Sequence, residues 1–328
     1  MATSYPVQRR LFGLAAKVET TYGADPVPTF ATNAVRLVDR PTITRNWLSP
    51  NSRETWFTGG LGELATVAPS GEWHEIDLQM VIHGAGAAYS ATVTPSIHPF
   101  LLAAGFAGTV VVSAGTESWT YAYTDQPATG LTVYTRLDGK EYKTSGCVVS
   151  EWSITADAGA YPVFNAKVQG FAHATVLTEV SIGTVTLPST LPPRFKSATC
   201  TIGAYAAGVI RSFELSGGNT VAGRGDGTAT AGHAGFRITR RQPRFIPRIE
   251  MPDITDFNPE ADWTASTTRA LALTIDETGD YNQYRIAAAD MRVIDFTDED
   301  DEGLTVIQPT YGIYTPSAGT ELSIAFAK

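Results

Sequence analysis

The sequence predicts a mainly β fold, built as two tandem β-sandwich or barrel domains that each carry a short helix and a long hairpin. Many short segments rich in Val, Ile, Thr, Tyr and Phe are separated by turn residues, and the chain holds 30 Gly and 19 Pro. Such punctuation is typical of all-β chains. Several segments alternate apolar and polar residues, as half-buried strands do. The same order of elements also recurs along the chain, which indicates one unit present twice.

The first unit opens with a weak helical stripe, which predicts a helix over Val7–Val18 that ends before Pro26 and Pro28. The next elements are expected in the order strand, long loop, strand, short helix and a closing pair of strands: Ala34–Thr44, Asn46–Ser70, Glu72–Ile82, Ser96–Ala104, Cys147–Asp157 and Tyr161–Phe171.

The second unit repeats this order after the Pro-rich stretch Leu187–Pro193. Its expected strands, Gly-rich loop and helical stretch are Val209–Ser216, Gly217–Gly235, Phe236–Arg240, Asn258–Ser266, Arg269–Asp276, Tyr284–Phe296 and Leu304–Tyr314. A chain of 328 residues is long enough for two domains. The sequence therefore predicts domains over 1–186 and 196–328, joined by a linker over 187–195.

Alternation is clearest in Glu72–Ile82, where His74, Ile76, Leu78, Met80 and Ile82 share one face. The buried face predicts a hydrogen-bonded core position for His74. Apolar and polar residues also alternate in the closing hairpin and in Val209–Ser216, so these strands are expected to expose only one face to water. Their polar-face residues are Glu75, Asp77, Gln79, Glu151, Ser153, Asn165, Lys167, Gln169, Ser212 and Glu214.

Composition excludes several classes of protein. The net charge is −9, and both halves carry an acidic excess, which disfavours a nucleic-acid reader. We expect no membrane-spanning segment and no secretory signal. Cys147 and Cys200 are too few for a disulfide framework and are expected to be buried thiols. The histidines lack metal-ligand spacing, and no nucleophile motif accompanies them, so neither a cofactor nor an enzyme is expected.

The loop Asn46–Ser70 is unusually long and carries Trp47, Arg53, Trp56 and Phe57. Long loops in compact domains are usually functional or disordered, and large aromatic side chains argue against plain disorder. The loop is therefore a candidate partner surface.

Three segments stand out along the chain: the N-terminal stretch Lys17–Thr29, the helix ending in a Gly-Phe pair over Ile97–Phe106, and Arg211–Val221. In this order they resemble the tail tube proteins of tailed bacteriophages, also called major tail proteins, of the two-domain type, and Arg211–Val221 is similar to the start of the second domain. The resemblance extends along most of the chain. The resemblance implies β-sandwiches that offer four-stranded inner sheets to rings, and rings that stack into a hollow tube for DNA.

On this resemblance the chain is a non-catalytic virion protein of the phage tail, assembled in the host cytoplasm. Its partner would be itself, in hexameric rings or in trimeric rings with pseudo-six-fold symmetry. The resemblance also implies tape-measure and terminator or baseplate proteins as partners. DNA would pass without specific binding, because the polar faces that would line the channel are mostly acidic or neutral. Lys167 departs from that pattern and is expected to pair with Glu151.

Contacts between rings are expected from the long loop and from two charged clusters. The residues concerned are Trp47, Arg53, Trp56, Phe57, Arg240, Arg241, Arg244, Asp298, Asp300 and Asp301. We also expect the N-terminal segment and the C-terminal strand Glu321–Phe326 to complete sheets between subunits. Solvated side chains, a calcium site in the acidic cluster and DNA contact by the arginines remain alternatives for these clusters.

The triplet Arg224-Gly225-Asp226 is expected to be an ordinary Gly-rich turn rather than an adhesion motif. The alternative function is an extracellular β-sandwich binding module or adhesin.

Overall fold

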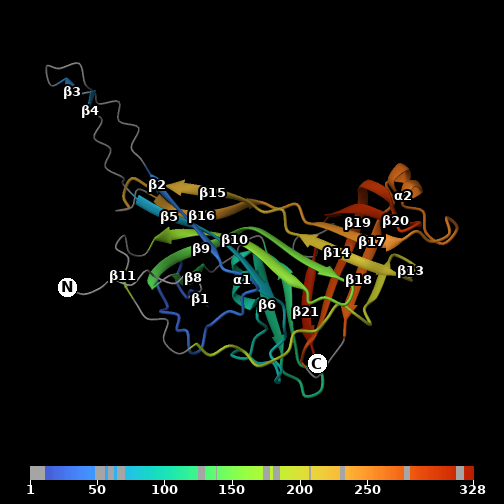
Figure 1. Cartoon of the computed structure of the whole chain (residues 1–328), viewed down its shortest axis with the longest axis horizontal. Helices are drawn as coiled ribbons and strands as arrows, with labels where there is room; N and C mark the ends of the chain where they lie inside the picture. Colours follow the sequence, from blue (N-terminus) through green and yellow to red (C-terminus); the bar gives the residue numbers. More distant parts are fainter. Residues whose placement is uncertain are drawn as a thin grey trace.

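A computed structural model describes residues 12–48, 56–57, 63–64, 71–124, 130–137, 139–172, 178–179, 185–206, 208–229, 233–276, 281–314 and 321–328. These residues form β strands with two short helices, as the sequence predicts (Figure 1). One hydrophobic core runs through both halves of the chain and holds most of the buried aromatic and aliphatic side chains. The free thiols of Cys147 and Cys200 are both buried, as expected.

The first half of the chain contains the following elements: β1 (Phe12–Val18), β2 (Thr42–Leu48), β3 (Trp56–Phe57), β4 (Glu63–Leu64), β5 (Gly71–Val81), α1 (His98–Ala103), β6 (Phe106–Val111), β7 (Ser118–Tyr123), β8 (Leu131–Leu137), β9 (Lys140–Asp157), β10 (Val163–Ala172) and β11 (Thr178–Glu179).

The second half contains the following elements: β12 (Thr199–Ile202), β13 (Tyr205–Ala206), β14 (Ile210–Ser216), β15 (Thr220–Gly225), β16 (His233–Arg240), β17 (Arg244–Glu250), α2 (Pro259–Ala265), β18 (Arg269–Ile275), β19 (Gln283–Asp301), β20 (Leu304–Tyr314) and β21 (Ser323–Ala327).

Strand neighbours repeat between the two halves. In the first half the antiparallel order is β2, β5, β10, β9, with β8 and β1 beside the start of β9. In the second half the order is β14, β17, β20, β19, with β18 and β12 beside the start of β19. A two-stranded hairpin follows the first strand of each set, β3 with β4 and β15 with β16.

The two sets are joined into one sheet. β14 pairs with the second half of β9, from Ser212 opposite Asp157 to Ser216 opposite Ser153. The polar-faced strands therefore run side by side as β2, β5, β10, β9, β14, β17, β20 and β19. The order of elements recognised in the sequence thus ends in a single continuous surface.

Helix α2 begins at Pro259, and its N-cap Asn258 accepts a hydrogen bond from the Ala261 N–H through Oδ1 at 3.0 Å. It ends at Ser266, whose φ of 51° is left-handed, as is common where a helix terminates. Both helices lie within a residue or two of the ranges expected from the sequence.

Several sequence expectations were wrong. The N-terminal segment is not helical over its described part, because Phe12–Val18 forms β1 and pairs with β8, a tertiary contact that outweighs a weak helical stripe. β1 also shows that this part of the segment completes a sheet within the chain. The first long strand begins at Thr42 rather than Ala34, directly after Pro41, which has no N–H for a ladder.

The other errors concern the second half. The strand expected at Phe236–Arg240 is present as the end of β16, but β16 pairs with β15 inside the expected Gly-rich loop, and Arg224 and Gly225 lie in β15 rather than in a turn. The counterpart of β5 is instead β17, which contains Pro247 and which the sequence did not reveal. That proline lies where the pairing of β17 with β20 is interrupted between Phe245 and Ile249. The C-terminal strand β21 lies inside the chain between β7 and β19 instead of joining a second subunit.

Residues 187–195 are attached to both halves of the chain. The Asn282 side-chain amide donates to the Leu191 carbonyl oxygen at 2.8 Å, and the Thr190 hydroxyl donates to the Ala85 carbonyl oxygen at 3.2 Å. Phe195 is buried and packs edge-on against Phe213, with ring centroids 5.1 Å apart. The Pro-rich stretch is therefore a packed connection.

Candidate functional site: the polar face of the joined sheet

The polar-face residues that the sequence singled out lie together on adjacent strands. Glu75 is opposite Gln169, Asp77 opposite Lys167, and Gln79 opposite Asn165. Asn165 and Lys167 are in turn opposite Ser153 and Glu151. Ser212 and Glu214 extend the row across the junction, opposite Asp157 and Thr155. None of the ten residues is buried.

These strands form a wide, shallow groove of about 680 Å³. Alternation places the groove side chains in the water and the opposite face of each strand in the core, for example Leu78, Ala166 and Ile154. Several lining residues were not among the ten candidates, namely Asp39, Arg40, Thr42, Ser216 and Gln242. Alternation in β2 and β14 could have indicated Thr42 and Ser216, whereas Asp39, Arg40 and Gln242 lie outside the strands and carry no such signal.

Lys167 is surrounded by carboxylates. Its ammonium nitrogen lies 3.2 Å from Glu75 Oε1 and 3.8 Å from Glu151 Oε1, so Glu75 is the closer partner of the two. The hydrogen bond to Glu75 and the charge of Glu151 raise the pKa of Lys167. Desolvation raises the pKa of the neighbouring Asp77 carboxyl, with the charge of Lys167 acting against it. This cation is therefore neutralised within the groove.

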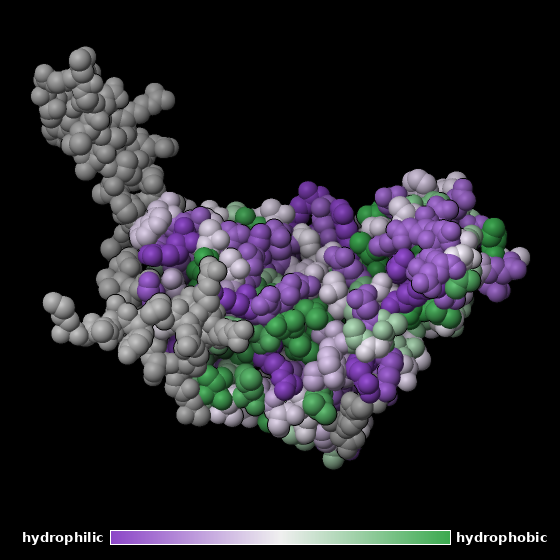
Figure 2. Space-filling model, in the orientation of Figure 1, coloured by the Kyte–Doolittle hydropathy of each residue, from purple (hydrophilic) through white to green (hydrophobic). Residues whose placement is uncertain are grey.

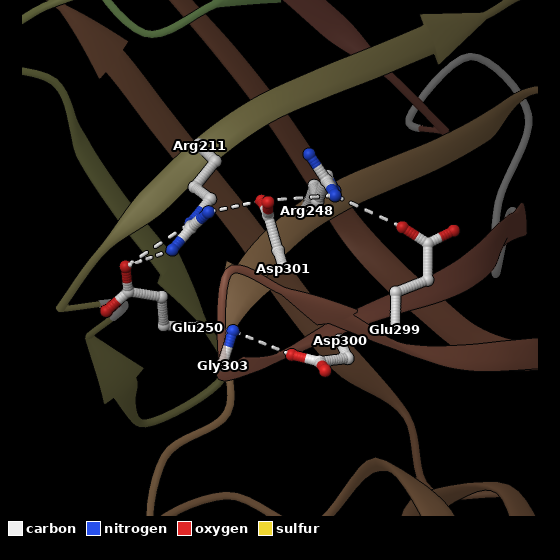
Figure 3. A network of polar contacts seen from close by, with 7 residues as sticks. All are labelled: Arg211, Arg248, Glu250, Glu299, Asp300, Asp301 and Gly303. Atoms are coloured by element: carbon white, nitrogen blue, oxygen red, sulfur yellow. Dashed lines mark hydrogen bonds and ion pairs between the residues drawn. The ribbon is translucent and has the colours of Figure 1, made fainter.

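A second charged network ties the far end of the sheet together (Figure 3). The Arg211 guanidinium bridges Glu250, at 3.0 Å, and Asp301. Arg248 reaches Glu299 at 3.1 Å and also Asp301 at 3.3 Å. The network connects β14 and β17 to the β19–β20 hairpin and balances both arginines with acidic partners.

The tip of that hairpin is a two-residue turn. Glu302 and Gly303 have φ values of 56° and 86°, the left-handed conformation that tight hairpin turns require. The Gly303 N–H donates to Asp300 Oδ1 at 2.8 Å. Asp300 is thus a turn-stabilising residue and Asp301 a member of the network, whereas Asp298 is exposed on β19.

The other residues expected at ring contacts have different positions. Arg241 is partly buried and pairs with Glu321, with Nε to Oε2 at 2.7 Å, and lies over the Tyr123 ring. Arg240 and Arg244 are exposed, and Arg244 lines the groove. Trp47 is 44% exposed. Arg53 and the side chains of Trp56 and Phe57 lie outside the described residues.

The row of polar-faced strands ends in two open edges among the residues that the structure describes. β2 pairs with β5 along one side only. The second half of β19, from Arg292 to Asp301, pairs with β20 along one side only, because its pairing with β18 ends at Met291. Exposed edges of this kind are templates for further strand pairing.

Two histidines have structural partners. His74 Nδ1 lies 2.8 Å from the Thr144 hydroxyl and His98 Nδ1 lies 2.7 Å from the Tyr121 hydroxyl, and burial lowers the pKa of both rings. His74 occupies the core position expected for it. Within the described ranges there is no group of His, Cys, Asp and Glu that could hold a metal ion. No helix in the same ranges is long and apolar enough to span a membrane.

Comparison with known proteins gives one result. No match was found among curated proteins. The phage tail tube protein family matches residues 13–326, which is nearly the whole chain and includes both sets of strands. The chain therefore belongs to the phage tail tube protein family, and it is a structural, non-enzymatic component of the phage tail.

Proposed function

We propose that the chain polymerises through its two open sheet edges into rings, which stack into a hollow tube that DNA crosses during ejection. The observation that supports this most directly is the joined sheet, which has one core-facing side, one continuous polar side and an unpaired strand edge at each end. An eight-stranded segment of this kind becomes a closed barrel when copies pair edge to edge.

The contact between copies follows from the contact inside the chain. β14 and β2 are each the first polar-faced strand of their set. Within the chain, β14 pairs with the C-terminal part of β9. The equivalent pairing joins β2 to the open part of β19 in a neighbouring copy. Carrying the internal register across places Thr44 opposite Thr297 and Thr42 opposite Glu299 of that copy.

We favour three chains in a ring. Each chain supplies two equivalent sets of four polar-faced strands, the first at residues 1–186 and the second at 196–328. Three chains would therefore give six sets and pseudo-six-fold symmetry. A six-chain ring would require only one set from each chain to face the channel, which is at odds with the continuity of β9 and β14.

The groove fits a channel for a polyanion. Its carboxylates outnumber its cations around Lys167, and Arg211 and Arg248 are already paired with acidic side chains. A surface with no cationic excess would not hold phosphates tightly, so DNA could slide. Tape-measure and terminator or baseplate proteins would meet the ends of the tube, in virions assembled in the host cytoplasm.

Electron microscopy of the purified chain over a concentration series tests the proposal. We expect rings or hollow tubes whose end-on averages show three-fold symmetry with six similar lobes. Six identical chains in a ring would contradict the stoichiometry but not the tube. A chain that stays monomeric at high concentration, even with a tail initiator complex added, would contradict polymerisation and favour a binding module.

A further inference from the structure

The hairpin β15–β16 shows what an occupied docking site in this fold looks like. Its base is held by Asn219, whose amide nitrogen donates to the carbonyl oxygens of Ala104 and Val149, both at 3.1 Å. Further along, the Phe236 ring lies 5.4 Å from Trp73 and 5.7 Å from Phe171. The second half of the chain thereby covers apolar surface on the first half.

The equivalent position on the second half can be located from two shared irregularities. The pairing of β8 with β9 shifts next to Cys147, and that of β18 with β19 shifts next to Met291. The pairing of β9 with β10 resumes at Glu151, and that of β19 with β20 resumes at Asp295. Met291 is therefore equivalent to Cys147, and Asp295 is equivalent to Glu151. Both pairs are separated by 144 residues along the chain.

This equivalence places Val293 where Val149 lies. Gln169 pairs with Glu75 and Gly312 pairs with the equivalent residue Arg244, so Gly312 is equivalent to Gln169. Tyr314 and Phe171 each lie two residues further along the strand and are therefore equivalent as well. The residue after each helix, Ala104 or Ser266, is the helix cap in both halves. The position equivalent to Phe171 and Val149 is thus formed by Val293 and its neighbour Ile294 of β19 and by Tyr314 of β20, named here the β19 edge site.

The β19 edge site exposes two large side chains, Ile294 at 36% and Tyr314 at 48%, whereas Val293 is buried beneath them at 5%. The Arg292 guanidinium lies over the Tyr314 ring, 5.8 Å from its centroid. A Cβ added at Gly312 would lie 3.1 Å from the Tyr314 hydroxyl and 3.3 Å from Ile294 Cγ2, so these two side chains converge over this glycine. Figure 2 shows the surroundings of α2, β19 and β20 as largely hydrophilic with hydrophobic residues set among them. Grouped apolar side chains within a polar rim usually mark an interaction surface.

The residue equivalent to Asn219 is Trp47. Thr44 pairs with Glu75 between β2 and β5, and Ser216 pairs with Arg244 at the equivalent position between β14 and β17. Trp47 follows Thr44 by the same number of residues as Asn219 follows Ser216. The chain between the paired residues is 30 residues long in the first half and 27 in the second. Trp47 is 44% exposed, so it offers an aromatic ring where the internal contact uses an amide.

We infer that the β19 edge site binds a second copy of this chain through the end of its β2–β5 ribbon, with Trp47 seated beside Val293 and Tyr314. The inference rests on the proposed ring, in which β2 lies beside β19 of the neighbour. It places Trp47 in a contact within a ring, whereas the sequence suggested a contact between rings. The apolar area of three large side chains would then leave water on assembly.

Site-specific photo-cross-linking tests the contact. The photoreactive residue benzoylphenylalanine replaces Trp47, labelled and unlabelled chains are mixed, and the assemblies are irradiated and mapped by mass spectrometry. We expect mixed-isotope cross-links from position 47 to peptides containing Val293, Ile294 or Tyr314. The same group at Asn219 is the control and should cross-link within one chain to the peptide containing Val149, in monomer and assembly alike.

Cross-links from position 47 that map to any other surface of assembled particles would overturn the inference and leave the tube intact. A second pair of variants does not depend on the photoreactive group. Combined Ile294→Asp and Tyr314→Asp substitutions should leave a folded monomer and raise the concentration needed for assembly at least about tenfold. Val112→Asp, a change at an apolar residue that is 65% exposed, should not. Equal assembly of both variants would also refute the contact, whereas failure of the unmodified chain to assemble even with a tail initiator complex added would refute the ring itself.

Discussion

At the scale of single residues, burial shifts the pKa values of several histidines and of both cysteines towards their neutral forms. Desolvation lowers the pKa values of His74 and His83, and lowers that of His98 to about 4. It also raises the pKa of both cysteine thiols, so neither is an activated nucleophile. These groups are neutral core components, which agrees with a structural rather than a catalytic protein.

The pH dependence of stability follows from His98. An unfolded histidine titrates near pH 6.5, so the unfolded chain binds a proton there that folded His98 takes up only near pH 4. This contribution to stability is complete above about pH 6.5 and is lost as the pH falls towards 4. We expect His98 alone to cost about 2 kcal/mol of unfolding free energy between pH 7.5 and pH 5.

Denaturant titrations of the monomer at both pH values check this. His98→Gln keeps a polar group for the Tyr121 hydroxyl and should remove most of the His98 part of the pH slope. An identical slope in the variant and the unmodified chain would show that His98 is not the group responsible.

At the scale of elements, the decisive feature is the junction between β9 and β14. It depends on Gly217, whose N–H donates to the Trp152 carbonyl oxygen at 3.1 Å. A Cβ at this position would lie 2.0 Å from Trp152 Nε1 and 2.3 Å from Cε2. Since the indole is buried and stacked on Phe164, it has no room to move aside.

We therefore expect Gly217→Ala to destabilise the chain by about 2 kcal/mol, within the usual range for overpacking. Gly225→Ala is the matched control, because nothing lies within 4 Å of its added Cβ and its φ is not positive. Thermal unfolding followed by circular dichroism compares them. Equal melting temperatures for the two variants would mean that the junction tolerates a side chain.

At the scale of the whole molecule, two related edge contacts organise the chain. One is made internally, between Ser216 of β14 and Ser153 of β9. The other is the proposed one between Thr44 of β2 and Thr297 of β19 in the next copy. Because the two halves share their strand order and bulges, the internal pairing is a template for the external one.

Paired cysteine substitutions distinguish the two contacts and count the chains. Ser216→Cys with Ser153→Cys should form a disulfide inside each monomer. Thr44→Cys with Thr297→Cys should form one only between assembled chains, giving a ladder on a denaturing gel that ends at the trimer. The native thiols are buried and should not interfere. A ladder continuing to six chains would exclude the trimeric ring, and absence of any ladder from intact rings would exclude this register.

The sequence by itself determined the faces of the strands and the class of the protein. Alternation placed His74 in the core and Glu75, Lys167 and Glu214 in water, because successive side chains of a strand point to opposite sides whatever its neighbours are. The order of elements and three resembling segments led to the tail tube family. Two short helices were also found, since a proline in the first turn of each and the Asn258 cap of α2 are local signals.

Only the tertiary structure decided which strands are neighbours. Pairing is a long-range property, so nothing local shows that β14 joins β9, that β21 lies between β7 and β19, or that Pro247 is tolerated inside β17 where its ladder is interrupted. The partners of Arg211, Arg241 and Asp301 depend on the same pairings. The open edges and the β19 edge site can be identified only when the pairing of all the other strands is known.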